Sequence, residues 1–255
     1  MELTVLGSGP AWPNPGGACS GYLVSSGGSH ALMECGPGVV GRLRAVLPVR
    51  DLSAVVVSHM HADHFLDLVP LRYGVKYGQL GGERPPLVLV PPGGARLLAR
   101  IGRALDGDPH FFSDVLHVRE YDPKAVLRLG PMAFSFQRVR HYVPAYAMRI
   151  EAGQALTFSG DAAPCRELVR HARGADALLC ESALERADQD SPDPKRRGHM
   201  CAAEAGQVAR QAGVGRLLIT HCRVDQADPD RPVREARRHF DGLVELVREG
   251  HVYRV

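Results

Sequence analysis

The chain has 255 residues, of which 45% are hydrophobic and 23% are charged, so a disordered, collagen-like or low-complexity protein is excluded. The formal net charge of +3 is too small for a dedicated nucleic-acid-binding protein, although a local basic patch can still attract a phosphate group. The six cysteines lie far apart and form no C-x-x-C pair, which predicts reduced thiols and no disulfide framework.

The chain shows no signal for a membrane or a secretory route. Its first residues, MELTVLGSG, lack the basic and apolar segments of a secretory leader, and no apolar run approaches roughly 18 residues. We therefore expect a cytoplasmic protein with no membrane partner. No linker divides the sequence, so we expect residues 1–255 to form a single domain.

Strand patterns dominate the first half of the chain, and helices alternate with strands in the second. Short β-branched or apolar runs predict strands over 2–6, 21–24, 31–34, 54–57, 87–90, 133–139 and 145–151. Helices are then expected over 165–172, 202–211 and 233–240, and strands over 177–180 and 216–220, with a strand pair ending at Val255. The Pro- and charge-rich stretch 185–198 is typical of a loop. This alternation predicts layers of helix over sheet.

The strongest signal directly follows the strand expected over 54–57. His59, His61, Asp63 and His64 place four potential metal ligands within a short strand-to-helix turn. Because alternate residues of an extended segment point the same way, His59 and His61 can face one ion, while Asp63 and His64 turn toward a second. A polar helix cap with solvated histidines is the alternative, but three histidines and an aspartate rarely gather there by chance.

This H-x-H-x-D-H motif resembles the metallo-β-lactamase superfamily, and the resemblance extends over nearly the whole chain. Members supply their remaining ligands from later loops, in the order histidine, aspartate after glycine, and histidine ending a strand. The resemblance implies a fold, an αββα sandwich of two mixed β-sheets flanked by helices. It also implies two divalent ions, zinc being expected and manganese or iron the alternatives. The implied ligands are His59, His61 and His141 for one ion, Asp63, His64 and His221 for the other, and Asp161 bridging both.

Two features select among the activities of this superfamily. The diiron flavoproteins carry a glutamate at the position of His61, so a redox function is disfavoured. True β-lactamases of the family lack a bridging carboxylate. Asp161 therefore favours a substrate whose oxygens span two ions, as in phosphodiester hydrolysis.

The segments 198–206 (GHMCAAEAG) and 212–217 (AGVGRL) are similar to ribonuclease Z, the tRNA 3′-processing endonuclease group, and to its phosphodiesterase relatives. There, the histidine at the place of His199 faces the scissile phosphate, which implies a proton donor or a phosphate contact. A histidine at a helix start with no chemical role is the alternative. Asp161 follows His141 by only 20 positions, too few for the tRNA-binding arm that typical members insert there.

The sequence therefore predicts a hydrolase that cleaves small or cyclic phosphodiesters with a hydroxide activated by two metal ions. Asp63 would orient or deprotonate the water, and His199 would assist the leaving group. A ribonuclease Z-like tRNA 3′ endonuclease and a hydrolase of lactones, thioesters or sulfate esters stay open as alternatives. A non-enzymatic metal-binding protein is the least favoured one. RNA stays open as a substrate despite the missing arm, and a homodimer as an assembly.

Three further sets of residues lie near the expected ligands in the sequence or in the resemblance. Glu181 and Thr220 adjoin the metal-binding loops and are expected to contact ligands, whereas Glu34 stands where the family usually has aspartate, which leaves its contact open. The basic run at 195–197 could neutralise a substrate phosphate or form a solvated surface: Lys195, Arg196 and Arg197.

Overall fold

The computed structural model describes residues 1–191, 193, 195–224 and 227–255, and its strands form two seven-stranded sheets. The first sheet has the order β14-β1-β2-β3-β4-β5-β6. Its strands are β1 (Glu2–Gly7), β2 (Gly21–Ser26), β3 (Ser29–Met33), β4 (Ala54–Val56), β5 (Leu87–Val90), β6 (His117–Glu120) and β14 (Val252–Arg254). The second sheet has the order β13-β12-β11-β10-β9-β8-β7. Its strands are β7 (Leu127–Leu129), β8 (Met132–Val139), β9 (Ala145–Glu151), β10 (Ala155–Phe158), β11 (Ala177–Glu181), β12 (Arg216–Thr220) and β13 (Leu243–Leu246).

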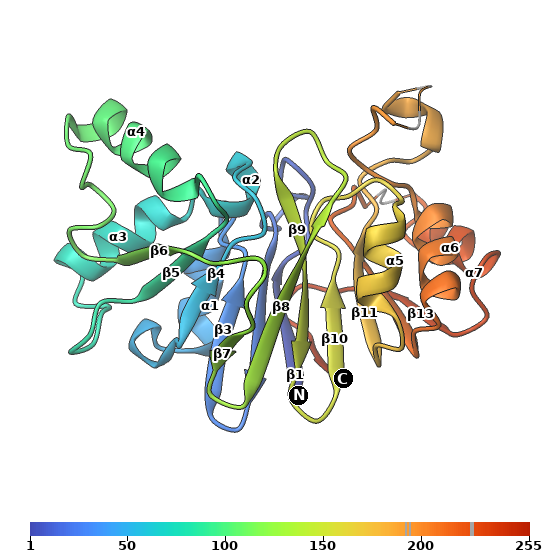
Figure 1. The fold of residues 1–255 in the computed structure, drawn as a ribbon, viewed down its shortest axis with the longest axis horizontal. Coiled ribbons are helices and arrows are strands. Elements are labelled where there is room, and N and C mark those ends of the chain that lie inside the picture. Colours follow the sequence, from blue (N-terminus) through green and yellow to red (C-terminus); the bar gives the residue numbers. More distant parts are fainter. Residues whose placement is uncertain (192, 194, 225–226) are drawn as a thin grey trace.

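Both sheets are mixed. Strands β3 to β6 run parallel to one another, and β1 pairs antiparallel with both β2 and β14. In the second sheet β10 to β13 run parallel, while β7 to β10 are joined as antiparallel neighbours. Helices cover the outer faces (Figure 1): α1 (Val39–Val46), α3 (Leu68–Tyr77) and α4 (Gly94–Asp106) on one side, α5 (Arg166–Ala172), α6 (Ala202–Ala212) and α7 (Arg231–Arg237) on the other. This architecture confirms the predicted αββα sandwich.

Strand alternation sorts the apolar side chains into layers. Tyr22, Met33 and Phe158 point between the sheets into a central buried cluster. Their strand neighbours Leu23 and Leu32 point the other way, into a cluster beneath the helices of the first sheet. A third cluster lies beneath the helices of the second sheet. Each fully buried side chain of this size contributes about 1.5–3 kcal/mol to folding, so these three layers stabilise the packing of the sheets and helices.

The predicted strands agree with the observed ones to within a few residues. The helix expected over 233–240 is corrected to Arg231–Arg237, since Asp230 precedes the helix and Pro232 occupies its first turn, where proline needs no N–H partner. Helices α1, α3 and α4 and strands β6, β7 and β10 were given no predicted range. All six cysteines are buried free thiols, as expected.

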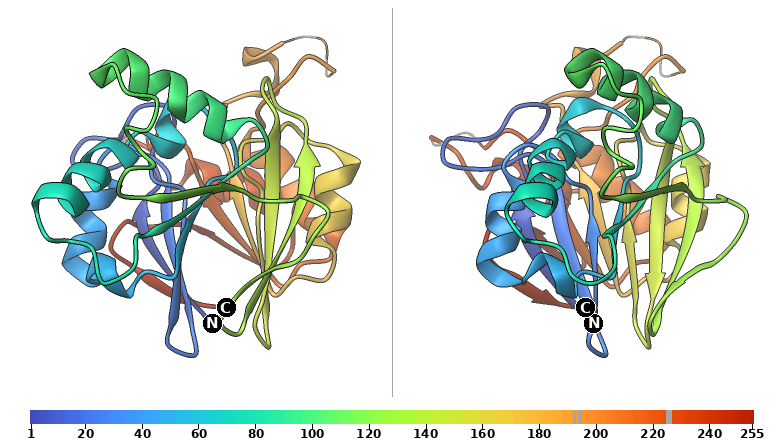
Figure 2. Two further views of the ribbon diagram at one scale, coloured as in Figure 1. Left: turned by 60° about the vertical axis from the view of Figure 1, so that its left-hand side comes forward. Right: turned by 90° about the vertical axis from the view of Figure 1, so that its left-hand side faces the viewer.

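The two ends of the sandwich differ in character. Figure 2 shows both chain ends at one end and helix α4 at the opposite end, together with the orange segment that includes residues 186–191.

Within the part of the chain that the structure describes, no helix combines the length and apolarity needed to cross a membrane.

Candidate metal centre

The predicted ligands leave their strands at one end of the sandwich. His59 and His61 follow β4, and Asp63 and His64 lie in the short helix α2 (Ala62–Phe65). The others follow strands of the second sheet: His141 after β8, Asp161 after β10 and His221 after β12. These three strands run in the same direction, so their carboxyl ends meet at one edge, where open α/β sheets commonly bind ligands. In Figure 1 this edge lies beside α2.

These side chains form two groups that share one carboxylate. Within each group the potential ligand atoms lie within 4.8 Å of one another. The first group is His59, His61, His141 and Asp161, and the second is Asp63, His64, Asp161 and His221. The structure thus brings all seven predicted residues together, and their role as ligands stays a prediction.

Asp161 occupies the middle of the cluster. Its Oδ2 lies 3.2 Å from His64 Nε2, 3.3 Å from His221 Nε2 and 3.7 Å from His59 Nε2. His141 Nε2 lies 3.0 Å from His61 Nδ1. Ligands about 2.0–2.2 Å from a tetrahedral ion are about 3.3 Å apart, so these separations suit atoms that surround a common centre.

Four of the five histidines have one ring nitrogen facing an oxygen atom of a residue outside the two groups. Such a contact fixes the ring tautomer and presents the opposite nitrogen to a metal. Three of the neighbours are neutral oxygens and one is a buried carboxylate. The hydrogen-bonded pairs are His59 Nδ1 with Ser58 Oγ at 2.9 Å, His221 Nδ1 with Ser20 Oγ at 2.9 Å, and His141 Nδ1 with Gly198 O at 2.7 Å. The fourth contact, His64 Nδ1 with Glu34 Oε2 at 3.3 Å, is an ion pair without a hydrogen bond.

Several atoms at the centre of the cluster make no hydrogen bond. Among the described residues, His59 Nε2, His64 Nε2 and Asp161 Oδ1 are buried without a hydrogen bond. Each unsatisfied buried polar group costs about 1–3 kcal/mol, so the cluster is incomplete without a further partner. Imidazole nitrogens and carboxylate oxygens suit zinc, manganese and iron. The residues therefore fit a divalent metal centre.

Burial favours the neutral form of most of these imidazoles, which is the form that binds metals. His64 is the exception: burial opposes its charge, but the carboxylates of Asp161 and Glu34 raise its pKa well above the ordinary value. The imidazole of His64 is therefore protonated without a metal, and an ion held by its Nε2 would displace the proton on that nitrogen. Burial lowers the pKa of the remaining histidines of the cluster: His59, His61 and, to about 4 in each case, His141 and His221.

Two residues of the site adopt a left-handed backbone conformation. His221 has a φ of 48° and Glu34 a φ of 62°, and each lies immediately after a strand. A non-glycine residue in this region costs about 1–3 kcal/mol, and such strain gathers at functional sites. Glu34 accepts the Ser58 N–H through Oε1 at 2.9 Å, and its Oε2 faces the candidate ligand His64. Glu34 thus contacts a candidate ligand although the resemblance leads one to expect the shorter aspartate there.

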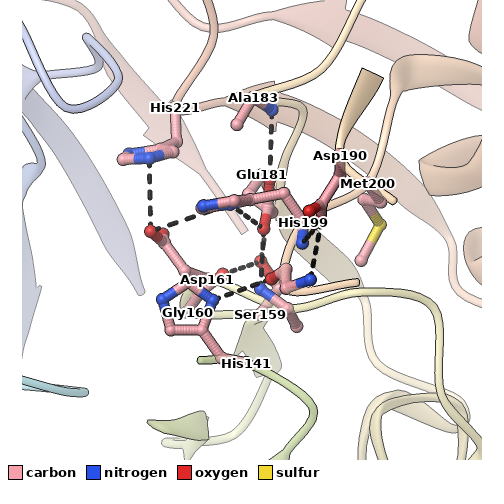
Figure 3. A network of polar contacts seen from close by, with 12 residues as sticks. His141, Ser159, Gly160, Asp161, Glu181, Ala183, Asp190, His199, Met200 and His221 are labelled. Atoms are coloured by element: carbon pink, nitrogen blue, oxygen red, sulfur yellow. Dashed lines mark hydrogen bonds and ion pairs between the residues drawn. The ribbon is translucent and has the colours of Figure 1, made fainter. Parts of the chain in front are cut away.

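His199 lies beside both groups and belongs to neither. Its Nδ1 lies 2.9 Å from Glu181 Oε1 and 3.9 Å from Asp161 Oδ2 (Figure 3). Glu181 ends β11, is fully buried, and accepts N–H bonds from Ala162 at 2.7 Å and Ala183 at 3.0 Å. Burial would lower the pKa of His199, but Glu181 raises it to about 9. A protonated imidazole with 19% of its side chain exposed can therefore donate to a molecule at the site.

The basic run ahead of His199 is only partly free to meet a substrate. Arg197 is 8% exposed and donates to both Glu204 carboxylate oxygens, at 2.7 and 2.6 Å. Lys195 and Arg196 are exposed. Pro192 and Pro194 of the same loop lie outside the described residues. Arg197 therefore stabilises its own segment, and only the other two cations remain available for a phosphate.

Three neighbours of the site differ from expectation. The Thr220 hydroxyl lies 2.7 Å from the Tyr22 hydroxyl, so it forms a hydrogen bond within the core and not with a candidate ligand. Ser20 and Ser58 contact ring nitrogens although the sequence interpretation did not single them out. Ser58 could have been found because it precedes His59 directly, whereas Ser20 lies 201 positions from its partner and carries no local signal.

Comparison with known proteins then identifies the family. Residues 30–222 match the model described as "Beta-lactamase superfamily domain". The chain belongs to the metallo-β-lactamase superfamily. This membership agrees with the αββα sandwich and with the His- and Asp-rich centre at its edge.

Three members of the metallo-β-lactamase superfamily illustrate the similarity. The probable metallo-hydrolase YhfI of Bacillus subtilis is 32% identical over 259 residues, which cover 99% of each chain, and its crystal structure superposes with a TM-score of 0.86. A ribonuclease Z of Mycobacterium marinum is 30% identical over 275 residues, covering 98% of this chain and 97% of that protein. Human tRNase Z, short form, shares the fold with a TM-score of 0.75 at 20% identity, covering 100% of this chain and 99% of that one. These similarities place the chain among the metallo-hydrolases of this superfamily.

Proposed function

We propose that this chain is a metal-dependent phosphodiesterase that hydrolyses small or cyclic phosphodiesters. The observation that carries the proposal is the position of Asp161, a buried carboxylate shared by two groups of potential ligands. A carboxylate shared in this way suits two close ions, and two close ions suit a substrate with two phosphate oxygens. We take the ions to be zinc in the first place, with manganese or iron as alternatives.

The chain's own residues divide the work of the proposed reaction. Bound divalent ions would activate water and stabilise the charge that develops on the phosphate oxygens. Although burial acts to raise the pKa of Asp63, its contact with His64 lowers it, so Asp63 is ionised and can accept a hydrogen bond from the attacking water. Glu181 engages His199 Nδ1, which leaves Nε2 to donate to the leaving oxygen.

The short segment between His141 and Asp161 supports the proposal that the substrate is small. It is filled by β9, a turn at 152–154 and β10, which pair residue by residue as an antiparallel hairpin. All residues of this interval are described, and none extends from the hairpin as an arm. Ribonuclease Z-like cleavage of RNA is the second candidate, favoured by the similarity to the M. marinum protein over nearly the full chain.

Metal content provides the first test. Protein produced with ample zinc or manganese is expected to carry about two ions per chain, because seven ligand positions are filled. Elemental analysis measures this directly. His117→Ala alters an exposed histidine of β6 outside both groups and should keep the wild-type content. One ion or none in the wild type would contradict the two-ion proposal.

Substrate preference provides the second test. Turnover of a bis-aryl phosphate and of a cyclic nucleotide is expected to exceed 3′ trimming of precursor tRNA, because no arm to hold tRNA extends from the described residues between His141 and Asp161. One preparation assayed on all three substrates gives the ranking. Faster trimming of tRNA would reverse the order of the two phosphodiester candidates. A parallel panel of lactone, thioester and sulfate ester detects a hydrolase of another class.

A further inference from the structure

Asp190 binds two consecutive backbone N–H groups beside the candidate metal centre. Its Oδ2 accepts from Gly198 N at 2.7 Å and from His199 N at 3.3 Å. Figure 3 shows Asp190 beside His199. The Tyr142 hydroxyl interacts with the same carboxylate. Although burial acts in the opposite direction, these donors lower the pKa of Asp190 and keep it ionised. We refer to Asp190, Tyr142 and Gly198 together as the latch.

Within the latch, Gly198 is the residue that contacts a candidate ligand. Its carbonyl oxygen lies 2.7 Å from His141 Nδ1, while its N–H donates to Asp190. A Cβ at position 198 would lie 2.6 Å from both Cε2 and Cζ of Tyr142, so a larger residue would displace either the ring or the peptide. The residue directly before His199 is thus fixed by three different contacts.

Arg197 holds His199 from the other side. Its guanidinium donates to His199 O at 3.2 Å and to the carboxylate of Glu204, in the first turn of α6. The backbone N–H of His199 is therefore held by Asp190 and its carbonyl by Arg197, while Glu181 holds the ring. Asp190 is the one of these three residues that is neither buried nor part of a helix or strand.

We propose that Asp190 is a positioning residue that sets the place of the His199 ring beside the candidate metal centre. It acts through the backbone of Gly198 and His199, since it belongs to neither group of potential ligands. The inference rests on the proposed role of His199 in hydrolysis. Catalytic groups act only within narrow limits of distance, and a shift of about 1 Å can cost roughly 10²-fold in rate.

Kinetics of Asp190→Ala test the inference. We expect kcat on an ester with a poor leaving group to fall roughly 10- to 100-fold, with KM and metal content near those of the wild type. Asp190→Asn should recover most of the loss, because an amide oxygen can accept the same two N–H bonds. Asp188→Ala is the matched control, because Asp188 lies on the same segment and contacts the exposed Arg186 at 3.1 Å. An unchanged kcat in Asp190→Ala would overturn the proposal.

A double variant separates positioning from general destabilisation. In a His199→Ala background, Asp190→Ala should cause no further loss of kcat, because its effect passes through His199. A loss that multiplies fully with that of His199→Ala would overturn the proposal. The assay uses whichever ester the wild type turns over fastest, so a failure of the phosphodiester assignment leaves this test in place.

Limited trypsin digestion tests the latch without any substrate. Lys195 and Arg196 are exposed cleavage sites close to the residues that Asp190 holds. Asp190→Ala should be cut there several-fold faster than the wild type, and Asp188→Ala should not. Equal cutting of all three proteins would overturn the latch, whatever the protein hydrolyses. Faster cutting with no activity on any phosphodiester would support the latch and remove the proposed function.

Discussion

Replacing Asp161 with alanine is expected to remove most of the hydrolase activity, by roughly 10²- to 10³-fold or more, and at least part of the bound metal. The side chain is 2% exposed and is the one member common to both ligand groups, so no neighbour can replace it. Elemental analysis and kcat on a bis-aryl phosphate measure the two effects. Asp161→Asn keeps the side-chain shape but loses the charge, and should resemble the alanine variant.

The fold should survive this change. Asp161 follows β10 at the carboxyl end of the strand. Its removal relieves one buried atom without a hydrogen bond among the described residues, Oδ1, which offsets part of the loss of the contacts that Oδ2 makes with histidines. Melting curves recorded in a chelator compare the metal-free proteins. An Asp161→Ala protein with full activity and two ions would refute the bridging role.

Replacing His199 with alanine is expected to lower kcat by roughly 10²- to 10⁴-fold while the metal content stays constant, as for a lost general acid. His199 lies outside both ligand groups, and Glu181 raises its pKa to about 9 against the effect of burial, which supplies the proton. The loss should shrink for an ester of p-nitrophenolate, because that leaving group departs without a proton.

The alternatives for His199 give distinct results. Loss of metal in His199→Ala would make this histidine a ligand. An equal loss of rate for good and poor leaving groups, with the metal retained, would indicate stabilisation of the phosphate instead of acid catalysis. No loss would leave His199 without a chemical role. His117→Ala serves again as the control for removal of a histidine outside the site.

Some members of the cluster could be predicted from their local spacing in the sequence, and others only from the resemblance to a family. The spacing of His59, His61, Asp63 and His64 alone places four side chains on one turn, because an extended segment passes directly into a helix there. His141 and Asp161 have no such local geometry. They could be assigned only through the order of ligands in a family that the chain resembles, and the structure brings them together at the edge of the second sheet.

Other features depend on contacts that the sequence does not record. Arg197 belongs to a basic run, and charge pattern alone cannot distinguish a solvated cation from one buried against Glu204. Helix α3 contains Pro70 and Gly74, which weaken its helical pattern, and β6 is a short edge strand with mostly exposed residues. Helix α4 does carry a signal, since Leu98, Ile101 and Leu105 recur at helical spacing.

The strand order has a consequence for the route by which a newly made chain reaches its active form. Strands β1 to β6 all enter the first sheet and β7 to β13 the second, and β14 alone returns. Each sheet is built from sequence neighbours, so its strands can begin to pair while the rest of the chain is still being synthesised. A nascent chain that ends after β9 carries the candidate ligands up to His141 but lacks Asp161 and His221. We therefore expect the proposed metal centre to form in the last stage of folding, after the two sheets have docked.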